Sequence, residues 1–423
     1  MHAIEKILAR NSGRECVTAG EIVTAKIDFA EINDLYLQTV YSFYEMGGEK
    51  VWLSRCGGYA PEELLRQMEE AFTALGVWEE IRPGMKVVLK PNLVMSSKPE
   101  AAIATHPALV AAVGKCVQKA GGEVLIAESP GGPYTPAAMK AIFRGCGYTD
   151  MAKDCGFALY TACKSREVTL PRAQRCRQLS VAEPFLTRDY LIDLCKLKTH
   201  GMVGFSGAVK NLFGAVPGLQ KPELHCRFPE KQPFSEMLVD LCDFLQPDLC
   251  IMDGILAMEG NGPTGGQPRK MGVLGASKSP YALDVCGASL IGMKPESVLM
   301  LKEANRRGLG PLSPEECQLV KEPVAPLAQP DFVKAKASST DFIDRLPSFL
   351  RPAAKKIATP TPKIRKKECV GCGRCAESCP QHTIQIREGK AVIDYKNCIR
   401  CFCCHEMCPK HVIDIRRWSV LHF

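Results

Sequence analysis

The residues with the clearest chemistry are eight cysteines near the end of the chain, arranged in two copies of one spacing. Each copy reads C-x2-C-x2-C-x3-C-P, and the eight cysteines are Cys369, Cys372, Cys375, Cys379, Cys398, Cys401, Cys404 and Cys408. Thiolates are soft ligands, and this doubled spacing is the pattern of bacterial two-cluster ferredoxins. Three thiolates of a run can hold three corners of a cubane, while the fourth crosses to the other cluster. The sequence therefore predicts two [4Fe-4S] clusters.

The crossing of the fourth cysteine divides the ligands between the two clusters. The predicted sets are Cys369, Cys372, Cys375 and Cys408 for one cluster, and Cys379, Cys398, Cys401 and Cys404 for the other. Thiolates also bind zinc, so a pair of zinc-binding loops is the alternative, although zinc ribbons seldom show a doubled triplet with a trailing proline. Cys403 lies between two ligands and belongs to neither triplet, and we expect it to be a small apolar filler.

The segments around these cysteines predict a small domain and a tether. Strand-like segments at 382–394 and 411–417 follow the two runs, so we expect an α+β ferredoxin-like domain over 368–417 that folds around its metals. Such a domain implies a redox partner protein. The preceding segment, 321–367, is rich in Pro, Ala and Lys and is predicted to be an extended linker. Its basic end has no interleaved aromatic residues, so no nucleic acid is expected as a partner.

The large middle part of the chain, residues 49–320, alternates short apolar runs with amphipathic ones. Buried strands are predicted at 51–56, 86–90, 123–128, 191–196, 248–253 and 271–277, and helices at 61–76, 107–122, 234–245 and 280–292. Such alternation predicts an α/β layered fold with a largely parallel sheet. Ligands bind such sheets at the carboxyl ends of the strands, so the residues that follow each strand are the candidates for a site.

Polar, turn-forming residues follow four of the predicted strands. The candidates there and in the segments just after them are Lys90, Asn92, His106, Gly131, Gly132, Lys198, His200, Lys210, Asn211, His225, Asp253, Glu259 and Asn261. Lysine and histidine side chains, together with the backbone amides of a glycine loop, suit a carboxylate or phosphate, so an anionic ligand is predicted. We expect Lys198, His200 and Lys210 to bind or protonate it. Glu259 or Asp253 would be a base or a metal ligand, and the other residues would bind or orient the ligand.

Each of these residues also has a plain structural interpretation. His106 precedes a predicted helix, and a lone histidine there is more often a helix-start or packing residue than a catalyst. Lys90 and Lys198 could be ordinary charges, the glycine loops could be turns, and Asp253 could only cap the loop that follows it. What favours a site is that several such residues converge at predicted strand ends.

The middle part also resembles a known family. The segments VVLKPNLV, LCKLKTHGMVGFSGAVKNLFGAVPG, KPELHCRFP and DLCIMDGILAMEGNGPTGG are similar to the prokaryotic family called domain of unknown function 362, over about residues 49–320. Family members that end in a two-cluster ferredoxin domain resemble the whole chain apart from its start. The family has no established reaction, so the resemblance implies an architecture and a site, and no substrate.

The first 48 residues carry a different resemblance. KILAR, SGRE, GEIVTAKID and MGGEKVW are similar to the N-terminus of the large subunit of 3-isopropylmalate dehydratase. Where that family has a histidine–aspartate pair, this chain has Asn33–Asp34, and none of that family's cluster cysteines can be placed here, so dehydratase activity is not expected. We interpret residues 1–48 as a leader with a helix at about 2–10 and a strand at about 21–27. Met46 could itself begin a chain.

The composition predicts a soluble protein of two or three domains. The chain has 423 residues, of which 46% are hydrophobic and 24% are charged. It contains no apolar run of about 18 residues and no signal sequence at its start, so a cytoplasmic protein with no membrane partner is expected. The 22 cysteines are therefore not interpreted as a disulfide framework. The oligomeric state is left open.

Three functions fit these features. In the first, the protein is an iron–sulfur oxidoreductase or electron carrier whose clusters exchange electrons with an anionic ligand bound in the middle domain. In the second, it is a binding or cluster-assembly protein. In the third, it is a non-redox isomerase or lyase that uses lysine and histidine as acids and bases. The sequence favours the first, because a tethered cluster domain beside a ligand site shortens electron transfer.

Overall fold

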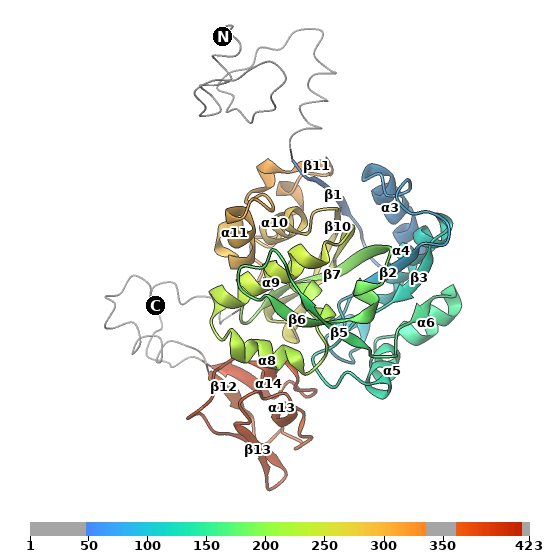
Figure 1. The fold of residues 1–423 in the computed structure, drawn as a ribbon. Helices are drawn as coiled ribbons and strands as arrows, with labels where there is room; N and C mark the ends of the chain where they lie inside the picture. Colours follow the sequence, from blue (N-terminus) through green and yellow to red (C-terminus); the bar gives the residue numbers. More distant parts are fainter. Residues whose placement is uncertain (1–47, 336–360, 417–423) are drawn as a thin grey trace, which may run out of the picture. The chain divides into compact units, whose positions relative to one another are not determined.

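The computed structural model describes residues 48–335 and 361–416 (Figure 1). Contacts between residues divide the chain into two units at Gly47–Gly48, and the described residues all belong to the second unit. The helix predicted at 2–10, the strand predicted at 21–27 and most of the dehydratase-like leader therefore lie outside the described residues.

One large mixed sheet forms the centre of the middle domain (Figure 1). Its strand order is β11-β1-β10-β9-β7-β2-β3-β4, and the short strand β8 pairs with β7. The strands are β1 (Lys50–Arg55), β2 (Lys86–Pro91), β3 (Glu123–Ile126), β4 (Ala158–Leu159), β7 (Tyr190–His200), β8 (Gly204–Ser206), β9 (Leu249–Asn261), β10 (Gly265–Ser277) and β11 (Gln318–Lys321). The strands from β9 to β4 pair in parallel, whereas β10 is antiparallel to both β1 and β9. The predicted α/β fold with a largely parallel sheet is confirmed.

Helices pack on both faces of this sheet. They are α3 (Pro61–Ala74), α4 (Pro107–Lys119), α5 (Pro136–Gly145), α6 (Tyr148–Cys155), α7 (Ala208–Asn211), α8 (Gln220–Arg227), α9 (Lys231–Leu245), α10 (Pro280–Leu290) and α11 (Leu299–Arg306). A separate hairpin is made of β5 (Ser165–Thr169) and β6 (Gln178–Ala182). Because side chains alternate along β2, Val87 and Leu89 pack in an apolar cluster with α3 and α4, while Val88 packs in another with α9 and α10. These two clusters are the core.

Three strands, β7, β9 and β10, are much longer than predicted, and this changes the surroundings of the predicted site residues. β7 continues to His200, so Lys198 and His200 lie within the strand and not in a turn after it. β9 and β10 extend to a hairpin with its tip at 262–264, so Glu259 and Asn261, expected in a segment after the strand predicted at 248–253, lie within β9. The reason is pairing, since Lys198 is in register with Met258 of β9. Lys198 and His200, whose polar side chains resemble turn residues in the sequence, are thus hydrogen-bonded within the sheet.

A small domain follows the middle domain, and we call its residues 361–416 the cysteine lobe. Its elements are β12 (Thr361–Ile364), α13 (Arg374–Glu377), β13 (Ile384–Arg387), β14 (Lys390–Ile393), α14 (Cys403–Glu406) and β15 (Ile413–Arg416). β12 pairs with β15 and β13 pairs with β14, both antiparallel. The linker predicted at 321–367 is therefore too long at both ends. Phe332 is buried in the core of the middle domain, and β12 already belongs to the lobe.

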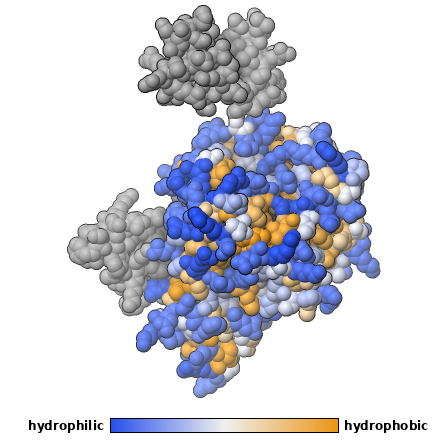
Figure 2. Space-filling model, viewed as in Figure 1, coloured by the Kyte–Doolittle hydropathy of each residue, from blue (hydrophilic) through white to orange (hydrophobic). Residues whose placement is uncertain are grey.

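The surface of the described residues is largely hydrophilic, with hydrophobic residues gathered toward the middle of the face shown in Figure 2. Its exposed large hydrophobic residues are Leu219, Val333, Val370, Ile386 and Tyr395. Within residues 48–335 and 361–416, no helix has both the length and the apolar character needed to cross a membrane.

Candidate functional site

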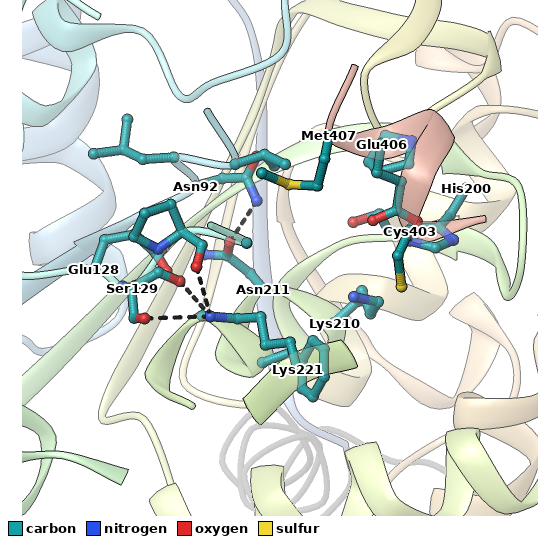
Figure 3. A pocket seen from close by; sticks show the side chains of 18 of the residues that line it. Asn92, Glu128, Ser129, His200, Lys210, Asn211, Lys221, Cys403, Glu406 and Met407 are labelled. Atoms are coloured by element: carbon teal, nitrogen blue, oxygen red, sulfur yellow. Dashed lines mark hydrogen bonds and ion pairs between the residues drawn. The ribbon is translucent and has the colours of Figure 1, made fainter. Parts of the chain in front are cut away.

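A cavity opens at the carboxyl edge of the large sheet, where the strand order reverses. β3 lies on one side of β2 and β7 lies on the other, and ligands bind α/β sheets at such a switch point. The cavity encloses about 700 Å³, including its mouth, and we call it the lysine cavity. Figure 3 shows side chains that surround it, which include Asn92, Glu128, Ser129, His200, Lys210, Asn211 and Lys221, and Lys198 and His225 also line it. Seven of the residues predicted from the sequence line it, namely Asn92, Gly131, Lys198, His200, Lys210, Asn211 and His225.

A chain of buried hydrogen bonds runs from the lysine cavity into the sheet. Lys198 Nζ donates to Asn92 Oδ1 at 2.7 Å, and Asn92 Nδ2 donates to Asn211 Oδ1 at 2.8 Å. Asn211 Nδ2 donates in turn to Asp193 Oδ1 at 2.8 Å. Burial raises the pKa of Asp193 to about 8, so this carboxyl group is protonated at neutral pH. This series of hydrogen bonds therefore fixes the side chains of Asn92 and Lys198 through the neutral groups of Asn211 and Asp193.

Two of the three lysines at the cavity have their N–H groups engaged by neutral acceptors. Lys198 Nζ contacts, besides Asn92, the carbonyl oxygens of Ile103 and Pro263 at 3.0 and 3.4 Å. Lys221 Nζ contacts one hydroxyl and three carbonyl oxygens, from Ser129, Pro130 and Val216. Burial lowers the pKa of Lys198 and of Lys221 to about 7. Both ammonium groups supply positive charge to the cavity while their donors are already used.

Lys210 differs from these two lysines. Among the residues that the structure describes, its ammonium group has no hydrogen-bond or ion-pair partner, and Nζ lies 4.6 Å from the centre of the Phe213 ring. The carboxylate of Asp284 accepts the backbone N–H groups of Ala208 and Val209, at 2.6 and 3.0 Å, and so holds the short helix α7 that carries Lys210. Burial lowers the pKa of Lys210. Of the three lysines, Lys210 is thus the one whose donors are available to a ligand.

Two histidines complete the polar part of the cavity. His200 Nδ1 accepts two backbone N–H groups of the turn after β7, so the ring proton of the neutral imidazole is on Nε2. That nitrogen lies 3.6 Å from Oε1 of Glu406. His225 stacks on Phe234 with ring centres 4.4 Å apart, and its buried Nδ1 has no hydrogen-bond partner. Burial lowers the pKa of both histidines, to about 3 for His225, so both are neutral.

The cysteine lobe forms one wall of the lysine cavity, through Ser378, Cys403, Glu406 and Met407 (Figure 3). The tip of the β9–β10 hairpin holds the lobe there. Thr264 Oγ1 donates to the carbonyl oxygen of Glu406 at 3.1 Å, and His405 Nε2 lies 3.3 Å from the carbonyl oxygen of Asn261. Asn261, predicted to bind a ligand, therefore contacts the lobe through its backbone.

The glycines after β3 have a role other than the predicted one. Their backbone amides were expected to approach an anion, but the N–H of Gly131 donates to the carbonyl oxygen of Val94 at 3.5 Å. A Cβ atom at Gly131 would lie 2.9 Å from the sulfur of Met407, and one at Gly132 would lie 3.3 Å from its methyl group. The two glycines therefore make room for the cysteine lobe.

Lys90 and His106 lie near the cavity without lining it. Lys90 Nζ pairs with Glu128 Oε2 at 2.7 Å, and both side chains are buried. His106 begins α4, where its Nδ1 accepts the N–H of Ala108 at 3.2 Å and its ring stacks on Tyr59 at 3.7 Å. The plain structural interpretation of His106 as a helix-start residue describes what the structure shows. Lys90 acts by holding Glu128, which does line the cavity.

Asp253 and Glu259, predicted as a base or metal ligand, lie outside the cavity. Asp253 pairs with Lys196 Nζ at 2.8 Å and accepts the hydroxyl of Tyr59 at 2.8 Å, so its carboxylate is fully used. Glu259 accepts the N–H of Val333 at 2.9 Å. Adjacent residues of a strand point to opposite faces, and Glu259 points away from the face on which Met258 packs. Glu259, predicted to be catalytic, therefore does not line the lysine cavity.

The eight predicted cluster ligands gather around two further cavities. The first, of about 350 Å³ including space open to solvent, is lined by Cys369, Cys372, Cys375 and Cys408. The second, of about 330 Å³ including space open to solvent, is lined by Cys379, Cys398, Cys401 and Cys404. These groupings are those that the crossing of the fourth cysteine predicts.

Two of these thiols accept hydrogen bonds from the backbone of the cysteine lobe. The backbone N–H of Ala391 donates to Cys369 Sγ at 3.4 Å, and that of Thr383 donates to Cys379 Sγ at 3.3 Å. In the described ranges, no group of three or more His, Cys, Asp or Glu side chains lies close enough to hold a single metal ion. The cysteines surround cavities instead, and two sets of four thiols fit two cubane clusters.

Cys403 connects the second cysteine cavity with the lysine cavity, because it lines both. Among the described residues, none lines both the first cysteine cavity and the lysine cavity. The interpretation of Cys403 as a filler accounts for its burial but not for this position. The second cysteine set is thus the one that shares a wall with the lysine cavity.

Comparison with known proteins agrees with this architecture. Residues 87–289 match the family model described as domain of unknown function (DUF362), and residues 361–409 match that of the 4Fe-4S dicluster domain. A thylakoid-associated protein of Synechocystis is 32% identical over 269 residues, which cover 63% of this chain and 82% of that protein. The chain belongs to the DUF362 family. Its cysteine lobe is an iron–sulfur domain.

Two weaker likenesses concern other proteins. A 3-isopropylmalate dehydratase large subunit of Desulfitobacterium hafniense is 26% identical over 181 residues, which cover 38% of this DUF362 chain and 43% of that subunit. The chain thus spans less than half of that relative. The lactate racemase apoprotein from Thermoanaerobacterium thermosaccharolyticum aligns with a TM-score of 0.36 and 14% identity, covering 64% of this chain and 60% of that chain.

Several residues of the DUF362 site were missed by sequence reasoning. They are Glu128, Ser129, Lys221, Cys403, Glu406 and Met407. Glu128 and Ser129 lie two and three residues after the end of β3, so the rule that ligands bind at strand ends could have found them. Lys221 lies four residues before His225 on α8, which puts both on one face of a helix. Glu406 and Met407 carry no such signal, because they lie among cluster ligands.

Proposed function

We propose that this DUF362 protein is an iron–sulfur oxidoreductase that holds two [4Fe-4S] clusters and binds an anionic ligand in the lysine cavity. Clusters of this type supply one-electron transfer when bound. The observation that carries the proposal is the position of Cys403, which lines both the lysine cavity and the second cysteine cavity. A ligand in the lysine cavity would then be separated from the second cysteine set by a single residue.

The residues of the lysine cavity have distinct roles in this proposal. Lys210 donates to the anionic group of the ligand, because its N–H groups have no other partner among the described residues. Lys198 and Lys221 add positive charge in a site of low dielectric constant, where an ion–ion attraction is stronger than in water. His200 donates through Nε2 on the side of Glu406. The cysteine lobe covers the cavity and limits the access of water.

A redox partner protein and a cytoplasmic location belong to the same proposal. An external donor or acceptor is needed because each cluster must regain or pass on an electron after it has exchanged one with the ligand. None of the 21 cysteines in the described part of the chain forms a disulfide, and this many unpaired cysteines suit a reducing compartment.

Anaerobic purification tests this function. We expect iron and sulfide in the ratio of two [4Fe-4S] clusters, and mass spectrometry of the extracted protein should find an anionic small molecule. Reduction by dithionite, followed by addition of that molecule in its oxidised form, should reoxidise the clusters. Clusters that no low-potential reductant reduces, or turnover that survives cluster removal, would contradict the proposal. The latter result would favour a non-redox isomerase or lyase.

A further inference from the structure

We infer that Lys210 is a nucleophilic amine that forms an imine with the carbonyl carbon of a 2-oxo acid in the lysine cavity. The inference rests on the proposed function in one respect, because both place an anionic ligand in this cavity. It adds a covalent role for one residue and names the chemical class of the ligand.

The first support is that Lys210 is free to react, whereas its neighbours are not. Lys198 Nζ has three oxygen acceptors within 3.4 Å, and Lys221 Nζ has four, so both nitrogen atoms are engaged by the protein. Lys210 Nζ has no hydrogen-bond or ion-pair partner among the described residues and lines the cavity. Of these three amines, only that of Lys210 can approach a ligand without breaking existing hydrogen bonds.

The second support is the surroundings of Lys210 Nζ. The nitrogen lies over the rings of Phe213 and Phe234, at 4.6 and 5.8 Å from their centres, so much of its hydration shell is replaced by hydrocarbon. Burial is the largest influence and lowers the pKa of Lys210, whereas the negative charge of Glu406 acts in the opposite direction. A lysine desolvated in this way keeps more of its neutral amine at neutral pH, and the neutral amine is the form that attacks a carbonyl carbon.

The third support is the set of groups that would receive the rest of a 2-oxo acid. The positive charges of Lys198 and Lys221 favour a carboxylate in the cavity, and neither residue forms an ion pair with a carboxylate of the described residues. The N–H of His200 at Nε2 can donate to the oxygen of the ketone or aldehyde. A 2-oxo acid places these two oxygen groups on neighbouring carbon atoms, and it offers its carbonyl carbon to the amine.

The proposed step is balanced within the cavity. The neutral amine of Lys210 adds to the carbonyl carbon to give a carbinolamine. The carbon–oxygen bond then breaks, a carbon–nitrogen double bond forms, and the oxygen leaves as water with the two hydrogen atoms that the amine carried. No oxidant or reductant is consumed, so imine formation is independent of the redox state of the cysteine lobe.

Reductive trapping of the anaerobically purified full chain tests this inference. The protein is incubated with glyoxylate or pyruvate and sodium cyanoborohydride, digested, and mapped by mass spectrometry. We expect a reduced adduct on the peptide that contains Lys210, at a yield at least about ten-fold above that on any surface lysine. Lys210→Arg keeps the positive charge but cannot form an imine, so the adduct at this position should disappear.

Two controls separate this inference from the proposed function. Lys119→Arg changes a lysine whose side chain is 62% exposed, and it should leave the labelling of Lys210 unchanged. Oxalate carries two carboxylates but no reactive carbonyl, and it should compete with glyoxylate for the cavity. Labelling spread evenly over surface lysines while oxalate still binds would overturn the inference and leave the anion site standing. If neither glyoxylate nor oxalate binds, both proposals fail.

Discussion

Nε2 of His200 lies 3.6 Å from Oε1 of Glu406, and this contact joins the central strand β7 to helix α14 of the cysteine lobe. His200 belongs to the middle domain, whereas Glu406 stands between the predicted cluster ligands Cys404 and Cys408. Side chains from the two domains therefore face one polar cavity. Five results would show whether the cavity works as its geometry indicates.

Replacing two buried aspartates with asparagine should have unequal effects on stability. Asp193 is protonated at neutral pH, because burial raises its pKa to about 8, so Asp193→Asn keeps a neutral partner for Asn211. Its free energy of unfolding should fall by less than about 1 kcal/mol. Asp253→Asn leaves the buried ammonium group of Lys196 without its carboxylate and should cost about 3–5 kcal/mol. Urea unfolding at neutral pH measures both values, and equal losses would show that Asp193 is ionised.

A methyl group at Gly214 should disturb the cavity, whereas one at Gly57 should not. A Cβ atom at Gly214 would lie 1.9 Å from Oε1 of Glu128, whose carboxylate is held by Lys90 at 2.7 Å. Gly214→Ala should lower the free energy of unfolding by about 1–3 kcal/mol and weaken anion binding. Gly57→Ala is the matched control, because nothing lies within 4 Å of the added atom. Thermal unfolding measures the stability of both variants, and equal stability would contradict the close contact between Gly214 and Glu128.

The binding of a non-reactive anion such as oxalate should weaken as the pH rises through about 7. Burial lowers the pKa of Lys198 and of Lys221 to about 7, so both groups are charged below that pH and lose their charge above it. Oxalate stays ionised over this range and gains from the charged lysines. Its Kd should therefore rise about ten-fold or more between about pH 6 and about pH 9. Calorimetric titration measures this, and a Kd that is constant with pH would mean that these lysines do not face the anion.

More of the fold than of the site could be predicted from the sequence. Apolar runs such as 86–90 and 123–128 are short and bounded by turn residues, so local periodicity was enough to place β2 and β3. The same periodicity placed Lys198 and His200 in a turn after the strand, and this was wrong. A polar residue that is paired in a sheet has the same local pattern as a turn residue when its pairing partner is unknown. The cluster ligands were recognisable from spacing alone.

The wall that the cysteine lobe contributes could not be predicted from the sequence. Glu406 and Met407 are surrounded in the sequence by cluster ligands, and nothing local indicates that they face Lys210 and Gly131. Their position depends on how two domains dock, which is decided by contacts such as that of Thr264 with the backbone of Glu406. Long-range docking of this kind leaves no periodic pattern in either partner.

Cys403→Ala should weaken the effect of a bound anion on the clusters without changing how many clusters the protein binds. Cys403 lines both the lysine cavity and the second cysteine cavity but belongs to neither predicted ligand set. The variant should keep the iron and sulfide content of the unaltered protein, because all eight predicted ligands remain. Any effect of oxalate on the clusters should become weaker. Cys116→Ala, at a buried position of α4, is the control, and loss of iron only in Cys403→Ala would mean that Cys403 is itself a ligand.

The shared wall between cluster and ligand is tested most directly by electron paramagnetic resonance of the reduced, anaerobically purified protein with and without saturating oxalate. We predict that oxalate changes the signal of one cluster and leaves the other unchanged, because, among the described residues, the second cysteine cavity shares Cys403 with the lysine cavity and the first shares none. Lys210→Gln should abolish this change while both signals remain. Spectra that stay identical, although calorimetry shows that oxalate is bound, would contradict the placement of ligand and cluster on the two sides of Cys403.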